Sequence, residues 1–224
     1  RGELLSQGYG GGTANIEFEA LTGFSMEPFA ANITTPYTQF LSSRDNFPSI
    51  VSRLEQAGFR TTAIHPYNTT MYKRLENYEA LGFDTFLYED TMANTAKLDT
   101  NPYISDAAAY AEITAILKAS AEKDFIHLVT MQNHTPYQDK YTATPSAAET
   151  GIVSQSIRNY LQDLQYSDQA LAELLATLQE WDEPTLVVFW GDHWPSVFGE
   201  ELYALNTLQN MHETPLFIYS NTQE

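Results

Sequence analysis

The sequence of 224 residues contains no cysteine. The absence of thiols excludes disulfide bonds, thiolate metal sites and any catalytic group derived from cysteine. Basic residues are scarce as well: 11 lysines and arginines stand against 29 aspartates and glutamates, which gives a formal net charge of −18. So acidic a chain is unsuited to nucleic acid, and we expect no nucleic-acid partner. A site for an anionic group must be built locally, from a metal, arginine, histidine or helix ends.

Long apolar runs are also missing. No stretch is long enough to cross a bilayer, and the first ten residues, RGELLSQGYG, do not resemble a signal peptide. If the protein works at a membrane, we expect the membrane contact to come from parts outside this chain. The hydrophobic share of 43% and the aromatic share of 13% suit a substantial core. We therefore predict a single domain over residues 1–224.

The order of the predicted elements indicates an α/β fold. Apolar residues at helical spacing predict helices over residues 46–58, 104–121 and 153–181, the first with Pro48 near its start and Gly58 at its end. Short apolar runs predict strands over residues 60–65, 124–131, 184–193 and 215–220. Segments 92–104 and 136–151 are expected to be surface loops. Because helices and strands alternate and the strands lack a polar face, we predict a mostly parallel sheet sandwiched between helices.

Polar side chains lie at or just past the ends of three of the predicted strands. These side chains are His65, Asn133, His134, Asp192 and His193. Because the carboxyl ends of parallel strands meet at one edge of a sheet, where ligand sites collect, we expect these side chains to lie close together. Taken singly, each has a plainer explanation as a hydrogen-bonded cleft residue or a turn. His127, inside an apolar strand, is predicted to be a core residue.

The stretch GGGTANIEFE, residues 10–19, places Thr13 between three glycines and a predicted helix. The plain interpretation is a capped turn, with Thr13 as N-cap and Glu17 near the positive helix end. The functional interpretation is that the glycines let the backbone approach an anion while the hydroxyl points at it. A threonine hydroxyl becomes a nucleophile only if its pKa is lowered. A divalent metal held by Asp192 and His193 would lower it, which favours metal-assisted phosphoryl transfer.

Four motifs follow one another along the chain: GGGTANIEFEALTG, AIHPYNTTMYKR, TMQNHTPY and FWGDH. Together they resemble the lipoteichoic acid synthase and phosphoglycerol transferase family, which belongs to the alkaline phosphatase superfamily and is often labelled sulfatase-like. The resemblance covers almost the whole chain. It implies an alkaline phosphatase-like α/β fold and a catalytic domain on the extracellular face of the cell membrane.

The resemblance also implies a metal centre. Thr13 would be both the nucleophile and a metal ligand, and Asp192 and His193 would bind the same ion. A hydroxyl, a carboxylate and an imidazole suit one divalent ion, with manganese preferred and zinc or magnesium as alternatives.

Substrate contacts are implied in the same way. The matching positions are Arg74, His134, His65, Tyr72 and Asn133. Arg74 offers a planar fork that suits phosphate oxygens. His134 can donate to a phosphate oxygen or to a leaving alkoxide. Glu17 and Glu19 are expected to be carboxylates at the helix start without a chemical role.

The chain departs from the family pattern at both ends. The remaining metal ligand of the family is a glutamate at the end of the first sheet strand, and residues 1–12 contain no counterpart. Relatives also continue past the position of residue 224. We therefore expect a fragment of a catalytic domain, with its first strand and C-terminal elements missing. Three ligands are fewer than a closed site needs, so we expect this chain alone to bind metal weakly.

The functional hypothesis is a metal-dependent transferase. It would move a phosphoglycerol-type head group from a membrane lipid such as phosphatidylglycerol to a polyanionic or glycan acceptor of the cell envelope, through a phospho-threonine. A phosphoethanolamine transferase or a phosphodiesterase of the same superfamily is the alternative enzyme. A non-catalytic truncated domain is the third hypothesis. Cleavage of sulfate esters is disfavoured, because the nucleophile position holds threonine and the chain has no cysteine.

Overall fold

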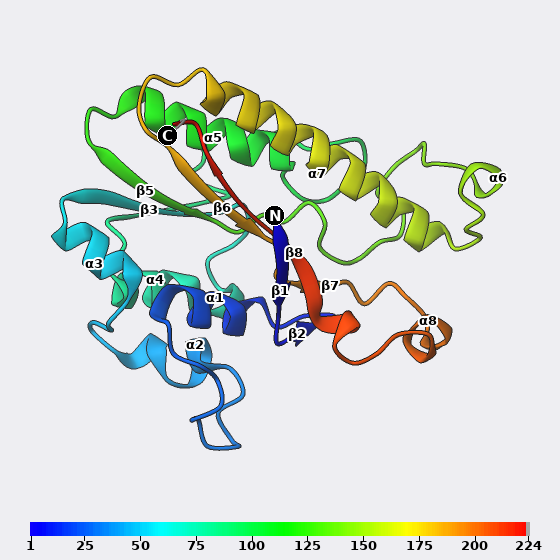
Figure 1. The fold of residues 1–224 in the computed structure, drawn as a ribbon, viewed down its shortest axis with the longest axis horizontal. Coiled ribbons are helices and arrows are strands. Elements are labelled where there is room, and N and C mark those ends of the chain that lie inside the picture. The colour runs from blue at the N-terminus through cyan, green and yellow to red at the C-terminus, as the bar shows by residue number, and fades with distance from the viewer. Residues whose placement is uncertain (223–224) are drawn as a thin grey trace. The chain divides into compact units, whose positions relative to one another are not determined.

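The computed structural model describes residues 1–222, which group into two compact units. The first unit takes Arg1–Thr13, Asp99–Asn101 and the chain from Asn133 onward; the second takes Ala14–Leu98 and Pro102–Gln132. Figure 1 follows the path of the chain from blue to red. Both ends of the described chain therefore belong to the first unit. The prediction of one domain stays a prediction.

The second unit contains a parallel sheet. Its strands are β3 (Phe59–His65), β4 (Thr85–Tyr88) and β5 (Lys123–Leu128), and β3 lies between the other two. Both pairings of β3 are parallel, with Ala63 opposite Phe86 on one side and opposite His127 on the other. The predicted strands at 60–65 and 124–131 are confirmed. Strand β4 was not predicted, since its four residues are too short for a clear pattern.

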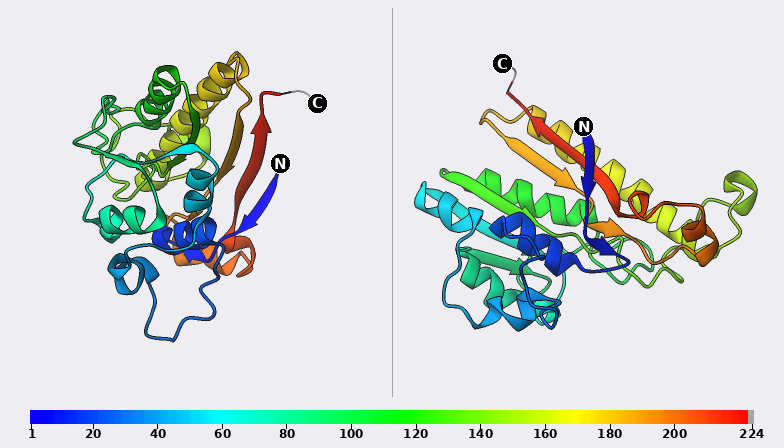
Figure 2. Two further views of the ribbon diagram at one scale, coloured as in Figure 1. Left: turned by 90° about the vertical axis from the view of Figure 1, so that its left-hand side faces the viewer. Right: turned by 60° about the horizontal axis from the view of Figure 1, so that its bottom comes forward.

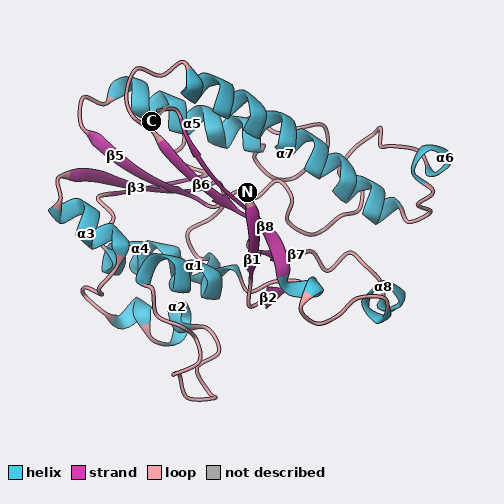
Figure 3. Ribbon diagram, viewed as in Figure 1, coloured by secondary structure: helices cyan, strands magenta, loops and turns pink. Residues whose placement is uncertain are grey.

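Helices of the second unit cover both faces of this sheet. They are α1 (Thr13–Thr22), α2 (Pro36–Gln39), α3 (Ile50–Gln56), α4 (Arg74–Leu81) and α5 (Asp106–Ala119), with 3-10 turns at Leu41–Ser43 and Met71–Lys73. Ala63 of β3 packs in a core with residues of α1, α3 and α4, and the next residue, Ile64, packs with residues of α5. Successive strand residues point to opposite faces, so β3 is buried from both sides. Figure 3 shows α5 on one side of β3 and β5, and α3 and α4 on the other.

Local sequence explains the two helices that were predicted here. Ser49, directly after Pro48, caps α3 with its side chain, and Ser52 completes a capping box. The side chain of Ser105 likewise caps α5 by accepting a hydrogen bond from the backbone of Ala108.

The first unit contains an antiparallel sheet. Its strands are β1 (Gly2–Leu5), β6 (Leu186–Trp190) and β8 (Glu213–Ser220), and β8 lies in the centre. Both pairings run antiparallel, with Val188 of β6 opposite Ile218 of β8 (Figure 2). The two predicted strands exist, but their relative direction is the reverse of that expected for a parallel sheet. Apolar runs mark strands without stating their direction, which depends on the path of the connection.

Helices of the first unit are α6 (Ala147–Thr150), α7 (Gln155–Gln179) and α8 (Glu200–Ala204), with a 3-10 turn at Asn210–His212. Helix α7 confirms the amphipathic helix predicted over residues 153–181. Its C-terminal end is tied to the sheet, because the Tyr219 hydroxyl donates to the Gln179 side chain at 2.7 Å. Within residues 1–222, no helix combines the length and the apolarity that a membrane span requires.

Candidate functional site

A short strand pair brings the glycine turn beside the Asp-His motif. Strands β2 (Gly8–Tyr9) and β7 (His193–Trp194) run parallel, with Gly8 opposite His193. Beyond them, the Gly10 amide donates to the Trp194 carbonyl at 2.8 Å. Gly10 has a positive φ of 64°, and a Cβ there would lie only 3.2 Å from the Cβ of Ser196. The turn therefore needs glycine both for its backbone conformation and for its close approach.

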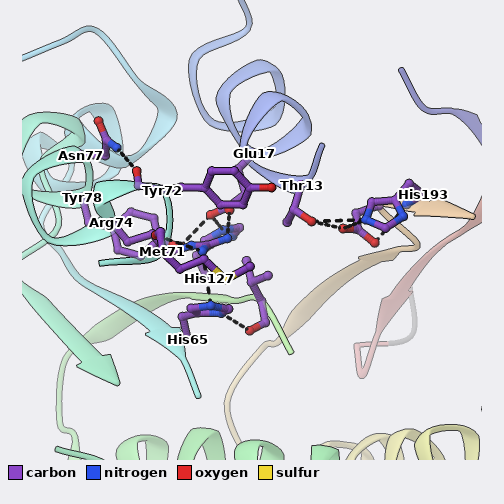
Figure 4. A network of polar contacts seen from close by, with 12 residues as sticks. Thr13, Glu17, His65, Met71, Tyr72, Arg74, Asn77, Tyr78, His127 and His193 are labelled. Carbon is purple, nitrogen blue, oxygen red and sulfur yellow. Dashed lines mark hydrogen bonds and ion pairs between the residues drawn. The ribbon is translucent and has the colours of Figure 1, made fainter. Parts of the chain in front are cut away.

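At the end of this turn, three polar atoms converge. The Thr13 hydroxyl donates to Oδ2 of Asp192 at 2.6 Å. The same hydroxyl oxygen lies 3.4 Å from Nε2 of His193, and Oδ2 of Asp192 lies 3.3 Å from that nitrogen. Figure 4 shows Thr13 and His193 with this contact as a dashed line. The first unit thus brings together the three residues that were predicted to hold a metal.

Backbone contacts orient both members of the Asp-His pair. Nδ1 of His193 lies 2.8 Å from the Trp194 carbonyl oxygen. A carbonyl only accepts, so Nδ1 carries a hydrogen, and Nε2 is the ring nitrogen that faces Thr13 and Asp192. Oδ1 of Asp192 accepts from the His193 backbone amide at 2.9 Å. The Asp192 side chain remains 40% exposed and that of His193 16% exposed, so the cluster is accessible from solvent.

The donor set fits part of a divalent metal site. Ligand atoms around one small cation lie about 3 Å from each other, as these three atoms do. A protonated Nδ1 held by a backbone carbonyl is also the usual support for a metal-binding Nε2. Among residues 1–222, however, no group of three or more His, Asp or Glu side chains is gathered for a metal. Thr13, Asp192 and His193 would therefore hold the ion through three donors, one of them a hydroxyl.

Asn133 and His134 also belong to the first unit, in the loop after β5. Oδ1 of Asn133 accepts a hydrogen bond from the Ser167 hydroxyl of α7 at 3.1 Å. Nδ1 of His134 lies 2.7 Å from the Thr135 carbonyl oxygen, which fixes Nδ1 as its protonated nitrogen. Both residues are partly exposed. Their predicted role as substrate contacts stays a prediction.

Arg74 lies in the second unit, inside a buried network (Figure 4). Its side chain is only 1% exposed. Nη2 donates to Oε2 of Glu17 at 2.5 Å and Nε donates to the Tyr78 hydroxyl at 3.1 Å. Nη1 lies 3.2 Å from Nε2 of His65. Each nitrogen of the guanidinium thus has a partner inside the protein, and direct contact with phosphate stays a prediction.

Glu17 is the residue that the sequence analysis missed. Its carboxylate is buried and accepts from Arg74 and from the Tyr78 hydroxyl, the latter at 2.6 Å. Burial acts to raise the pKa of the Glu17 carboxyl, but Arg74, His127 and Tyr78 together hold that pKa well below its ordinary value of 4.5. A signal existed: Glu17 follows Ala14 by three residues and precedes Leu21 by four, so it shares their buried helical face.

The two histidines of the second unit support this network. His127 is buried, as predicted, and its Nε2 lies 3.4 Å from Oε1 of Glu17. His65 is also buried, and its Nδ1 lies 2.9 Å from the Val129 carbonyl oxygen. The His65 Nδ1 must therefore carry a hydrogen, and its Nε2 accepts from Arg74.

Tyr72 holds an unusual backbone beside Arg74. Tyr72 and the next residue, Lys73, have positive φ angles of 57° and 52°. The Asn77 side chain donates to the Tyr72 carbonyl at 2.7 Å, and the Arg74 guanidinium lies 5.4 Å from the centre of the Tyr72 ring. Two consecutive non-glycine residues with positive φ raise the free energy of the folded backbone, and such strain is typical of functional sites. The structure thus brings together His65, Tyr72 and Arg74, while their expected approach to Thr13 stays a prediction.

Comparison with known proteins now identifies the family. The sulfatase family model matches residues 1–224. The chain belongs to the sulfatase family. It is 31% identical, over 98% of its length, to a Rhizobium meliloti protein named for cyclic beta-1,2-glucan modification. It is 30% identical, over 87% of its length, to the capsular polysaccharide biosynthesis protein RkpI of the same organism. The chain spans 36% and 34% of these two relatives, about a third of their length.

Solved structures show the same fold. The phosphoglycerol transferase GacH of Streptococcus pyogenes, in complex with sn-glycerol-1-phosphate, matches 98% of this chain and 58% of its own, with a TM-score of 0.82 and 26% identity. The lipoteichoic acid synthase LtaP of Listeria monocytogenes matches 96% of this chain and 55% of its own, with a TM-score of 0.75 and 22% identity. The α/β fold of the alkaline phosphatase superfamily, predicted from four motifs, is confirmed.

Proposed function

We propose that the protein is a metal-dependent transferase that moves a phosphoglycerol-type head group from a membrane lipid to a cell-envelope glycan. The observation that carries the proposal is the contact of the Thr13 hydroxyl with Asp192 at 2.6 Å and with His193 at 3.4 Å. A nucleophile, a carboxylate and an oriented imidazole at one point are what phosphoryl transfer through a covalent intermediate requires. The alternative for Thr13, a simple helix cap, does not explain this convergence.

The chemistry would run in two displacements. The Thr13 oxygen attacks phosphorus, and the bond from phosphorus to the lipid oxygen breaks, so diacylglycerol leaves and takes up a proton. An acceptor hydroxyl then attacks the phospho-threonine, and the bond between phosphorus and Thr13 breaks. Oδ2 of Asp192 accepts the hydroxyl hydrogen of Thr13 and so lies where that proton departs. When bound, a divalent ion such as manganese supplies charge that favours the alkoxide.

One group of relatives supports the proposed donor, and another supports the proposed acceptor. GacH is a phosphoglycerol transferase described with a bound glycerol phosphate, which supports a phosphoglycerol-type donor group such as that of phosphatidylglycerol. The Rhizobium relatives are named for a cyclic glucan and a capsular polysaccharide, which supports a glycan as acceptor. A structure of an Escherichia coli periplasmic domain of the same fold carries zinc, which supports a divalent ion. That periplasmic relative also supports action outside the cell membrane.

The test is a search for the covalent intermediate. The intact protein is exposed briefly to phosphatidylglycerol, and its peptides are analysed by mass spectrometry. We expect a phosphoglycerol adduct on the peptide that contains Thr13, its loss in Thr13→Ala and its partial retention in Thr13→Ser, which keeps the hydroxyl. The fold should survive, since the Thr13 hydroxyl contacts the partly exposed Asp192 and His193 and alanine suits the first position of α1. An adduct elsewhere, or full transfer by Thr13→Ala, would reject the proposal.

The donor is tested in the same assay. Phosphatidylethanolamine and a soluble phosphodiester are offered beside phosphatidylglycerol. Transfer of phosphoethanolamine, or simple hydrolysis, would replace the proposed donor while keeping the Thr13 chemistry. Metal bound by the intact protein without any reaction on these donors would favour a non-catalytic domain.

A further inference from the structure

Helix α7 carries a row of polar side chains on its buried side, where an amphipathic helix usually has apolar ones. We call this row the polar stripe. Asn159, Asp163 and Ser167 are four residues apart, so they lie along one face of the helix. Asn159 and Asp163 are fully buried, and Ser167 is partly buried. Buried polar side chains are costly unless they are hydrogen-bonded, so a row of them indicates a specific partner.

The partner of this stripe is the loop of residues 133–142, which we call the histidine loop because it contains His134. The Ser167 hydroxyl donates to Oδ1 of Asn133 at 3.1 Å. At the other end of the stripe, the Asn159 side chain donates to the Tyr137 carbonyl at 2.7 Å. His134 lies between these two attachment points in the sequence.

The centre of the stripe is a buried ion pair. The Lys140 ammonium donates to Oδ2 of Asp163 at 2.7 Å, and both side chains are 0% exposed. Oδ1 of Asp163 accepts from the Tyr141 hydroxyl at 2.6 Å and from the Asn101 side chain at 3.1 Å. Burying two charges yields little net stability compared with apolar residues of the same size. What such a pair supplies is a fixed geometry, because neither charge can leave its partner without a large penalty.

We propose that the polar stripe of α7 is a positioning element that fixes the histidine loop, and with it His134, for phosphoryl transfer. The inference rests on the proposed function, in which His134 contacts the transferred group. Ser167 and Asp163 are positioning residues: they act on the substrate only through the histidine loop. Without them, His134 would sample several positions, and turnover would fall more than substrate binding does, since misplacement of a contact by about 1 Å can cost up to a hundredfold.

The test compares Ser167→Ala and Asp163→Asn with Asp168→Asn, a matched control on an exposed face of the same helix. Ser167→Ala is the gentler variant, because it removes a neutral hydroxyl and leaves the buried ion pair intact. Ser167→Thr keeps the hydroxyl and serves as rescue. Hydrogen exchange is measured on peptides of residues 133–142, and kcat and KM are measured on the lipid donor in the intact protein.

We expect Ser167→Ala to speed exchange in the histidine loop about five- to tenfold, with α7 itself unchanged. We expect kcat to fall about tenfold with KM changed less than twofold. Because partial unfolding would also lower the apparent kcat, the effect is assigned to the histidine loop only if exchange in the rest of the chain stays unchanged. Asp163→Asn should have a larger effect in the same direction, and Ser167→Thr and Asp168→Asn should behave as the unaltered protein.

Unchanged exchange in residues 133–142 of Ser167→Ala, or equal effects in Asp168→Asn, would overturn the proposal. The exchange result does not depend on any reaction, so it stands apart from the proposed function. If Thr13→Ala keeps full activity while the loop loosens in Ser167→Ala, the chemistry is wrong and the loop attachment is right. If the loop loosens while kcat stays the same, the positioning role of the stripe is wrong.

Discussion

Two of the polar clusters among the described residues, one in each unit, are built in opposite ways. The cluster of the first unit, Thr13 with Asp192 and His193, is partly open to solvent and has only a few internal hydrogen bonds. The cluster of the second unit, Glu17 with Arg74 and Tyr78, is fully buried, and each charged atom has a partner inside the protein. An open set of donors can still bind a ligand, whereas a saturated buried set holds a structure. Changes to the two clusters should therefore have different consequences.

The largest effect, a loss of folding stability, should come from changes to the buried cluster of Glu17, Arg74 and Tyr78. Glu17→Gln leaves the Arg74 charge buried without its partner, and we expect the free energy of unfolding to fall by about 3–5 kcal/mol. Denaturant unfolding measures this loss, and Glu79→Gln on an exposed position of α4 is the control. The double variant Glu17→Gln with Arg74→Met should recover part of the loss, since it removes both charges. A loss below about 1 kcal/mol would mean that the pair is not structural.

The second largest effect, on metal binding and turnover, should come from changes to the open cluster of Thr13, Asp192 and His193. Asp192→Ala or His193→Ala removes a predicted metal ligand, and we expect most bound metal to be lost from the intact protein, with turnover lowered about a hundredfold or more. The free energy of unfolding without metal should change by less than about 1 kcal/mol, because both side chains are partly exposed. Metal analysis and chemical denaturation measure the two quantities. Asp182→Ala, an exposed position of the same unit, should leave both unchanged.

Acid should act on the buried cluster. The pKa of Glu17 is lowered on folding, so its contribution to stability is fully present above its ordinary pKa of 4.5 and decreases as pH falls below it. We expect the unfolding free energy of the protein to decline between about pH 5 and pH 3, and part of that decline to disappear in Glu17→Gln. Denaturant unfolding across this range, with Glu79→Gln as control, measures the effect. An identical pH profile in Glu17→Gln and in the unaltered protein would contradict the expected role of this carboxylate.

The smallest effect should come from the strained turn beside Arg74. Asn77→Ala removes the hydrogen bond to the Tyr72 carbonyl, and we expect a loss of about 1–2 kcal/mol. If the strain at Tyr72 serves the substrate, KM for the lipid donor should rise as well. Tyr72→Gly relieves the positive φ and should raise KM without that loss of stability. An unchanged KM in both variants would make this turn purely structural.

Much of this protein could be predicted from local sequence. Periodicity located α3, α5 and α7, because each presents apolar residues at a helical spacing, and Pro48 and Gly58 marked the two ends of α3. Apolar runs located β3, β5, β6 and β8. The glycines before Thr13 and the Asp-His pair after β6 indicated the open cluster, since few other residue types suit such turns and ligands. These signals depend on neighbours in the chain, which is why they are visible without a structure.

Tertiary contacts decided the rest. The antiparallel direction of β6 and β8 depends on how the chain returns through residues 191–212, and no apolar pattern records it. The role of Glu17 depends on Arg74, which lies 57 positions further along the chain, and the ion pair of Lys140 with Asp163 depends on α7. From sequence alone, a charged residue is predicted to be exposed, because burying a charge is tolerated only when another residue supplies the opposite charge. In these pairs that residue is distant in the chain.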